Sequence, residues 1–266
     1  MPKAFERKVF GKTGFTAGPL GIGSSYGPSG KSIEEAFDRG VNYFYWGWRR
    51  RAGMRDGLRE VVSKNREKAF ITINVIVPSY FLIKRSVTKS LKALGTDYID
   101  GIQFYLRSGG LWQSQIDTAL QLKEEGLIRH IGVSSHHRPA FEKFLGEPFS
   151  DFYHVRYNAK HRGAEKDVFP LMPPKGDERR PGMVAFTVTS WAQLIKASSA
   201  KLGGLPTPTA GDCYRFAMSN PDIDICITGP ANDEQMRHAL DAVDKGPMSE
   251  EELTWMRDVG DRLYKK

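Results

Sequence analysis

The sequence predicts an α/β protein built as one eight-stranded (β/α)8 barrel. Eight short apolar segments of strand-like composition alternate along the chain with longer segments that have helical periodicity. Strands joined by helix-length connections pair in parallel, and eight such units close into the architecture called a TIM barrel. The length of 266 residues is close to the ~250 residues of one such barrel, so we expect a single domain over residues 1–266.

The eight expected strands are short, and most are bounded by glycine, proline or polar residues. They occupy residues 19–23, 43–45, 70–74, 102–105, 131–134, 152–155, 183–186 and 223–227.

The helical segments carry recognisable end signals. Ser32 followed by Glu35 matches a capping box, and Arg39-Gly40 supplies the cation and the glycine that often end a helix. Residues 123–126 predict a helix end just before the fifth strand. Ser249 and Glu252 predict a second capping box, which opens a C-terminal helix.

Three segments lie outside the alternating pattern. Residues 7–14 predict a small β-hairpin ahead of the first strand, placed to plug the barrel floor. Residues 170–181 and 198–208 are rich in proline, glycine or charge and are expected to be loops. Neither loop is long enough to separate two domains.

Composition excludes several classes of protein. No apolar run reaches the ~18 residues of a transmembrane helix, and residues 1–8 lack the apolar core of a secretory signal. Cys213 and Cys226 are too few for a disulfide framework and are expected to be buried thiols. These features favour a cytoplasmic protein with no membrane partner.

The formal net charge is +8, which indicates either attraction to an anion or an ordinary basic surface. The basic residues are scattered, and no aromatic-basic module of the kind that binds nucleic acid occurs. We therefore expect a small-molecule partner and no nucleic acid. The main local exception is the Arg49-Arg50-Arg51 run, interleaved with Trp46 and Trp48, which predicts an anion clamp or a solvated basic loop.

Several motifs occur in a fixed order along nearly the whole chain. They lie at residues 11–14, 20–23, 35–44, 90–100, 122–126, 131–134, 157–158 and 227–229. Together they resemble the aldo-keto reductase family. The resemblance implies a nicotinamide dinucleotide bound at the C-terminal mouth of the barrel, and carbonyl reduction by a tetrad of Asp, Tyr, Lys and His.

The four tetrad positions carry other residues in this chain. Tyr45 stands at the Asp position, Arg50 at the Tyr position, Asn74 at the Lys position and Tyr105 at the His position. Arginine cannot donate a proton at neutral pH, and an amide cannot supply the charge that lowers a tyrosine pKa. Tyr45 or Tyr105 could replace the acid, since a phenol donates protons, or both could fill the mouth with aromatic bulk.

The cofactor positions are partly kept. The resemblance assigns cofactor binding to Gly23, Ser24, Ser134, Ser135, His154, Phe186, Gly229, Gln235 and Arg237. Phe186 keeps the aromatic residue that stacks on nicotinamide, whereas His154 replaces the usual Gln and Ser135 the usual Asn. Gln235 stands where a cation often binds the 2′-phosphate, and Arg237 nearby could substitute. The resemblance implies NADP(H), with NAD(H) as the alternative.

The histidines do not predict a metal site. His136 and His137 follow the fifth strand, His154 lies on the sixth, and His161 lies just beyond it. A catalytic metal needs three converging ligands with an open position, and no carboxylate accompanies them at a suitable spacing.

Three functional hypotheses remain open. The leading one is a divergent NADP(H)-dependent oxidoreductase that acts on a small, anionic carbonyl or alcohol substrate, with Arg50 holding the anion. The second is a non-catalytic barrel that binds a dinucleotide or metabolite as a sensor or partner protein. The third is a non-redox isomerase or lyase that uses the same mouth without nicotinamide.

Overall fold

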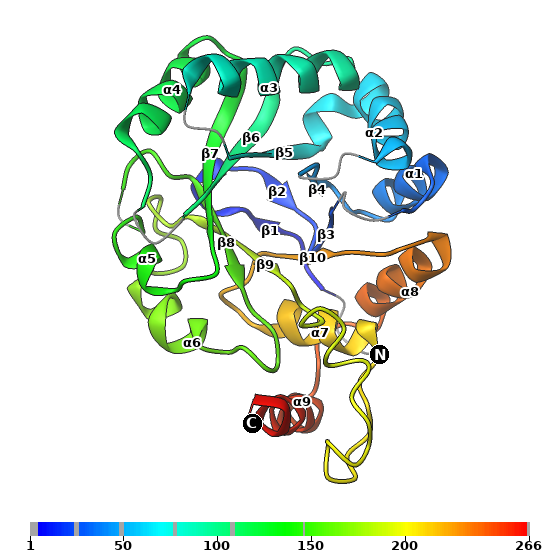
Figure 1. Ribbon diagram of the computed structural model, residues 1–266. Helices are drawn as coiled ribbons and strands as arrows, with labels where there is room; N and C mark the ends of the chain where they lie inside the picture. The colour runs from blue at the N-terminus through cyan, green and yellow to red at the C-terminus, as the bar shows by residue number, and fades with distance from the viewer. Residues whose placement is uncertain are drawn as a thin grey trace.

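The computed structural model describes residues 5–23, 27–47, 51–76, 79–106, 110–145 and 147–264. Eight parallel strands form a closed barrel in the order β10-β3-β4-β5-β6-β7-β8-β9, and the helices surround it (Figure 1). The predicted fold class is therefore confirmed. No helix in these ranges is long and apolar enough to cross a membrane.

Each expected strand is present, with small differences in its bounds. The strands are β3 (Leu20–Gly23), β4 (Tyr43–Tyr45), β5 (Phe70–Val75), β6 (Ile99–Tyr105), β7 (Ile128–Ser135), β8 (Phe152–Arg156), β9 (Gly182–Phe186) and β10 (Ile225–Thr228). Strands β6 and β7 begin three residues earlier than expected, because polar residues such as Asp100 and His130 interrupt the apolar pattern inside these strands.

Nine α-helices connect or follow the strands within the described residues. They are α1 (Gly30–Asp38), α2 (Ala52–Asn65), α3 (Tyr80–Leu94), α4 (Gln113–Glu124), α5 (Pro139–Glu142), α6 (Ala164–Asp167), α7 (Ala210–Ser219), α8 (Asp233–Asp244) and α9 (Glu250–Tyr264). Short 3-10 turns lie at η1 (Gly11–Thr13), η2 (Arg66–Lys68) and η3 (Phe169–Leu171).

The predicted capping box at Ser32 is wrong. Helix α1 begins three residues earlier, with Ser29 as its N-cap, and the Ser29 hydroxyl accepts the hydrogen bond from the backbone N–H of Ser32 at 3.2 Å. Two serines fit the spacing of an N-cap. Ser29 lies three residues before Ser32, and Ser32 lies three residues before Glu35. The second capping box is confirmed, because Ser249 N–H donates to Glu252 and Glu252 N–H donates back to Ser249.

An N-terminal hairpin closes the barrel floor. Strand β1 (Lys8–Val9) pairs antiparallel with β2 (Thr16–Ala17), so the hairpin extends three residues beyond the predicted end. Phe10, in its turn, is fully buried, and its ring centre lies 5.4–5.5 Å from those of Tyr43, Phe70 and Phe152. A Cβ on Gly182 would stand 2.3 Å from the Phe10 ring, so this approach requires glycine.

Aspartates near the start of three strands tie each strand to its neighbour at the floor. Each carboxylate accepts a hydrogen bond from a backbone N–H of the preceding strand. The bonds run from Ile71 to Asp100, from Ile131 to Asp151 and from Met183 to Asp224, each at 2.8 Å. Cations lie beside them: Arg66 pairs with Asp100 at 2.7 Å and Lys123 with Asp151 at 3.4 Å.

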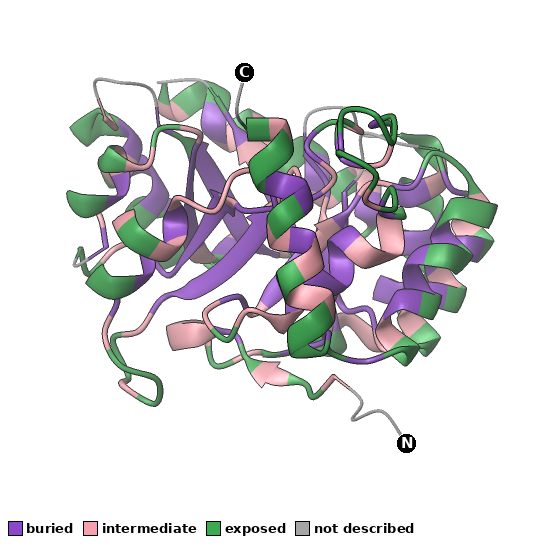
Figure 2. Ribbon diagram, turned by 90° about the horizontal axis from the view of Figure 1, so that it is seen from below, coloured by how far each residue is buried: buried purple, intermediate pink, exposed green. Residues whose placement is uncertain are grey.

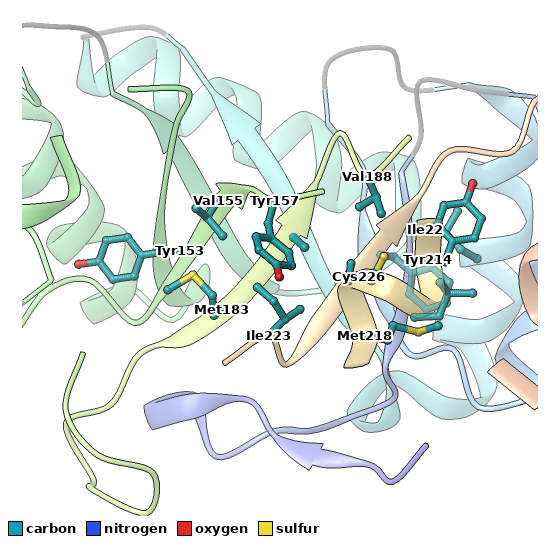
Figure 3. Close-up of a cluster of buried hydrophobic side chains, with 14 of the residues drawn as sticks. Ile22, Tyr153, Val155, Tyr157, Met183, Val188, Tyr214, Met218, Ile223 and Cys226 are labelled. Carbon is teal, nitrogen blue, oxygen red and sulfur yellow. The ribbon is translucent and has the colours of Figure 1, made fainter. Parts of the chain in front are cut away.

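The hydrophobic core lies between the barrel and its helices. Figure 2 shows buried residues in the strands and on the inner sides of helices, with exposed residues outside. Figure 3 shows Cys226 of β10 near Tyr214 and Met218 of α7. Cys213 and Cys226 are free, buried thiols, as expected, and burial raises the pKa of both.

A polar clasp joins the first helix to the last unit of the ring. Asp233, in the first turn of α8, accepts hydrogen bonds from the Ser29 backbone N–H at 2.6 Å and from the Ser29 hydroxyl at 2.8 Å. Ser29 is also the N-cap of α1, so one serine both starts that helix and links it to α8.

Candidate active site

The C-terminal ends of the strands present one set of inward-facing side chains. Tyr43, Phe70 and Phe152 pack on Phe10 inside the barrel, and every second residue after them shares that face. Register pairs such as Tyr105 with Ser134 and Arg156 with Phe186 extend the set around the ring. The members of this set nearest the C-terminal ends of the strands are Tyr45, Asn74, Tyr105, Ser134, His154, Arg156 and Phe186.

The deepest polar layer is a buried chain of hydroxyl and imidazole groups. The Thr72 hydroxyl donates to the Tyr43 oxygen at 3.1 Å, and the Tyr43 hydroxyl lies 2.6 Å from His154 Nε2. Burial raises the pKa of Tyr43, so its phenol keeps the proton. Burial also lowers the pKa of His154 to about 3, so the ring is neutral. Which of the two groups donates in this contact depends on the tautomer of the neutral ring.

Tyr45 occupies the level directly above His154. Its half-buried ring meets the His154 ring edge-on, with centres 5.2 Å apart. The hydroxyl end lies over Gly47, where a Cβ would stand 2.5 Å from Tyr45 Cζ. Gly47 therefore makes room for the tyrosine.

A buried amide acceptor lies beside Asn74. Gln103, the register partner of Asn74, is only 1% exposed, yet its Oε1 atom has no hydrogen-bond partner in the described part of the chain. Leaving such an atom unsatisfied costs ~1–3 kcal/mol. An N–H or O–H donor from a ligand would satisfy it.

Aromatic rings line the rim of the mouth. The His136 ring lies 4.9 Å from Phe186, 5.9 Å from Trp191 and 6.1 Å from Tyr105, measured between centres. Tyr105 is 39% exposed and Trp191 is 67% exposed. These rings offer apolar faces and edges to a ligand that enters from solvent.

A strained backbone segment follows Phe186. Thr187, Ser190, Trp191 and Ala192 have φ values of 57°, 51°, 52° and 67°, and none of them is glycine. Left-handed backbone costs such residues ~1–2 kcal/mol each. Hydrogen bonds from Ser190 N–H to Thr187 and from Gln193 N–H to Ser190 hold the turn. Strain of this kind concentrates at functional sites.

Comparison with known proteins identifies the lineage. The model of the aldo/keto reductase family matches residues 31–177, more than half of the chain. The chain belongs to the aldo/keto reductase family.

Solved structures and a curated relative agree with this assignment. Aldo-keto reductase AKR11C1 from Bacillus halodurans, in its holo form, superposes with a TM-score of 0.78 at 19% identity, over 96% of each chain. An aldo/keto reductase from Klebsiella pneumoniae in complex with NADP and acetate gives 0.76 at 20% identity, over 97% of this chain and 95% of that one. At these identities the likeness shows the fold.

The curated relative is the uncharacterized oxidoreductase YqkF of Bacillus subtilis. It is 24% identical over 204 residues, which cover 66% of this chain and 65% of YqkF. The matched part of the chain thus spans slightly less than two thirds of that relative's length.

In this member of the family, three of the four residues that the sequence resemblance places at the tetrad positions can be located. Tyr45, Asn74 and Tyr105 all lie on inward-facing positions near the C-terminal ends of neighbouring strands. Asn74 is half-buried, and the ring of Tyr105 reaches the exposed rim. Arg50 lies outside the described residues.

The cofactor positions divide into two groups. Gly23, Ser134, His154 and Phe186 belong to the inward-facing set, and Gly229 directly follows β10. Ser135 points to the opposite face of β7 from Ser134, and its hydroxyl accepts a hydrogen bond from His137 N–H at 3.0 Å. Ser24 lies outside the described residues.

The last two cofactor positions lie on α8. Gln235 and Arg237 are exposed in its first turns. Gln235 accepts a hydrogen bond from Ala231 N–H at 2.9 Å, so its side chain already stabilises the helix start.

Sequence reasoning missed Arg156, which ends β8 on the inward face. The signal was available, since Arg156 lies two residues after His154 and a strand repeats its face every two residues. No group of three His, Cys, Asp or Glu side chains that could hold a metal occurs in the described ranges.

Proposed function

We propose that this chain is an NADP(H)-dependent oxidoreductase that reduces a small anionic carbonyl compound or oxidises the corresponding alcohol. Family membership supports the reaction class, and Klebsiella pneumoniae relatives were solved with NADP or NADPH. The proposal treats residues 1–266 as one domain, in the cytoplasm. The observation that carries it is the pairing of Phe186 with the strained turn that follows it.

The residues around Phe186 fit a dinucleotide. The half-buried Phe186 ring offers a stacking surface for nicotinamide, and Ser134 and His154 offer hydrogen bonds to its carboxamide. Backbone N–H groups in turn conformations form anion-binding concavities, so the N–H groups of residues 187–192 that do not close the turn itself are the proposed donors to a pyrophosphate. When bound, the cofactor supplies or accepts the hydride.

Tyr105 is the proton donor in this proposal. It ends β6 at the family's histidine position, and its side chain reaches the exposed rim, where substrate and solvent protons arrive. Tyr45 is the alternative acid, but its hydroxyl end packs over Gly47 deeper in the mouth. Comparing Tyr105→Phe with Tyr45→Phe decides between them, since only loss of the acid should reduce kcat.

Recognition of the 2′-phosphate depends on Arg237, because Gln235 is occupied. Asp233 and Glu234 in the first turn of α8 place negative charge at the same end of the helix. This arrangement weakens phosphate binding by the helix itself, so the preference for NADP(H) over NAD(H) should be modest. The NADPH and NADH dissociation constants of Arg237→Gln and wild type measure it.

Fluorescence titration with NADPH tests the proposal directly. Saturable binding, competed by NADP, is the expected result for the wild-type protein. A protein that binds neither NADPH nor NADH would contradict the proposal and favour a non-redox isomerase or lyase.

A non-catalytic binding barrel is the second candidate. Replacement of the tetrad and the filling of its Asp position by Tyr45 favour it. The two candidates differ in turnover, so NADPH binding without oxidation, across aldehydes and oxo acids, would select the binding barrel.

A further inference from the structure

Arg156 is a partly buried cation at the barrel mouth. It is the last residue of β8, and it shares the inward face with His154 below it and with its register partner Phe186. Its guanidinium makes no hydrogen bond or ion pair with any residue that the structure describes. Arg156 is only partly buried, so its guanidinium remains accessible to a ligand that enters the mouth.

Nearby cations do have partners. Arg138 bonds to Asp167 at 2.7 Å, and Arg162 bonds to Asp261 at 2.7 Å. Lys160 donates to Gln193 at 2.8 Å. The carboxylates of this region are therefore already engaged.

The charges that face Arg156 come from three sides. Burial and Arg138 both lower the pKa of Arg156, and Arg156 in turn helps to lower the pKa values of His136 and His161. The Tyr264 hydroxyl, at the end of α9, is the group with the opposite influence. The charges that act on Arg156 thus come from a cation and a phenol, and the carboxylate of Asp167 is engaged by Arg138.

The sequence segments outside the described ranges carry no aspartate or glutamate and include cations at positions 49, 50 and 107. An external anion would supply the counter-charge that no described residue gives Arg156.

We propose that Arg156 is the anion-binding residue of the barrel mouth and holds the carboxylate or phosphate of a small carbonyl substrate. The inference deepens the proposed function and rests on it, because only an enzyme of that kind would make the bound anion a substrate. The neighbouring rings of Phe186, His136 and Tyr105 favour a ligand whose body is flat or apolar. Arg156 thus replaces Arg50 as the residue that selects the substrate class.

The anion is assigned to substrate because of where Arg156 lies. Its strand, β8, lies between β7, which carries His136 just beyond its end, and β9, which carries Phe186. The strained turn suited to pyrophosphate begins beyond Phe186, one strand further on. The alternative is that Arg156 binds a phosphate of the cofactor. The experiment below distinguishes this from a substrate anion.

The test uses the full chain and a matched pair of probes. 4-Formylbenzoate carries a carboxylate, and methyl 4-formylbenzoate is its neutral ester. Calorimetric titrations compare wild type, Arg156→Gln, Arg156→Lys and the control Arg179→Gln. Arg179 is 81% exposed in the loop before β9, at the floor end, so the control removes the same charge far from the mouth.

We expect wild type to bind the carboxylate at least about 10-fold more tightly than the ester. Arg156→Gln should weaken carboxylate binding about 10- to 100-fold, as expected for loss of a charge-assisted hydrogen bond, and leave ester binding unchanged. Arg156→Lys should retain part of the affinity, since lysine keeps the charge without the planar fork. Arg179→Gln should match wild type.

Three results would overturn the assignment. Equal binding of carboxylate and ester by wild type would remove the anion site, whatever the variants do. Loss of carboxylate binding in Arg50→Ala, with Arg156→Gln unaffected, would return the role to Arg50. Weaker NADPH binding with unchanged carboxylate binding in Arg156→Gln would assign the anion to the cofactor.

Failure of the proposed function has a different signature. Wild type that binds no NADPH but binds 4-formylbenzoate through Arg156 would refute the oxidoreductase and keep the anion site. If Arg156→Gln does not fold by circular dichroism, the wild-type preference for carboxylate over ester and the Arg156→Lys affinity still decide.

Discussion

The charged side chains at the two ends of the barrel differ in whether they have partners. At the floor, the carboxylates of Asp100 and Asp151 each accept a neighbouring backbone N–H and also contact a cation. At the mouth, Arg156 and the Oε1 of Gln103 lack partners within the described chain, and four consecutive or near-consecutive residues adopt left-handed backbone.

This difference separates stability from function. Satisfied polar groups and the Phe10 plug hold the strands in register, whereas unsatisfied groups and strain reduce stability unless a ligand binds. Barrel enzymes place active sites at the C-terminal end of the strands and use the other end for stability. The floor should therefore govern unfolding, and the mouth should govern binding and rate.

The largest expected effect concerns catalysis at the mouth. Generic aldehydes such as propionaldehyde should be reduced slowly, because a tuned general acid contributes ~10²–10⁴-fold and the sequence resemblance places Arg50 and Asn74 where the family carries the Tyr and Lys that provide it. The measurement is kcat/KM with NADPH, against a family member that carries the complete tetrad. Comparable rates would mean that Tyr105 or Tyr45 replaces the acid fully.

The floor should give the largest effect on stability. Phe10→Ala removes a fully buried ring packed on three others and should lower the free energy of unfolding by about 3–5 kcal/mol. Urea denaturation measures this change, and NADPH titration of the folded variant should match wild type. A weakened cofactor affinity would show that the two ends are coupled rather than separate.

His154 should make the protein sensitive to acid. Its pKa is about 3 in the folded chain and ~6.5 when unfolded, so between these values only the unfolded chain binds the proton. The contribution of His154 to the free energy of unfolding is therefore complete above pH ~6.5 and falls as the pH is lowered toward 3. The loss is about 2 kcal/mol by pH ~5.

The control for this pH dependence is His154→Gln, which keeps an acceptor for Tyr43 but does not titrate. Urea midpoints of the two proteins should diverge below pH ~6.5. Parallel curves would indicate that the imidazole is protonated in the folded state.

The smallest expected effect is at the stacking surface. Phe186→Ala should weaken NADPH binding by about 0.5–1.5 kcal/mol beyond the loss of contact area, the usual contribution of an aromatic stack. The dissociation constant measures it, with Phe10→Ala as the matched removal of a ring at the other end. Unchanged affinity would place the nucleotide away from Phe186.

Much of the fold follows from the chain's own pattern, because buried strands are apolar and helix ends carry capping residues. The starts of β6 and β7 were missed since Asp100 and His130 are polar residues placed by floor contacts. Pattern alone could not distinguish Ser29 from Ser32 as the N-cap of α1, because both lie three residues before a suitable partner.

The site was less predictable because its chemistry depends on contacts between distant strands. The positions of Tyr45, Asn74 and Tyr105 were correctly expected near strand ends, but nothing local indicates that Tyr43 and His154 form a hydrogen bond. Ser190 and Trp191 carry no glycine signal for left-handed backbone. Arg156 matters only because the folded mouth leaves it without a carboxylate.

The clasp between Ser29 and Asp233 also constrains how the barrel assembles. Its two residues are 204 positions apart, so the clasp joins segments synthesised near the beginning and the end of the chain. Contacts of such separation slow folding, since the intervening chain must first be ordered. We expect the seam between β3 and β10 to close last, leaving both strands with unpaired edges until the end of the chain is available.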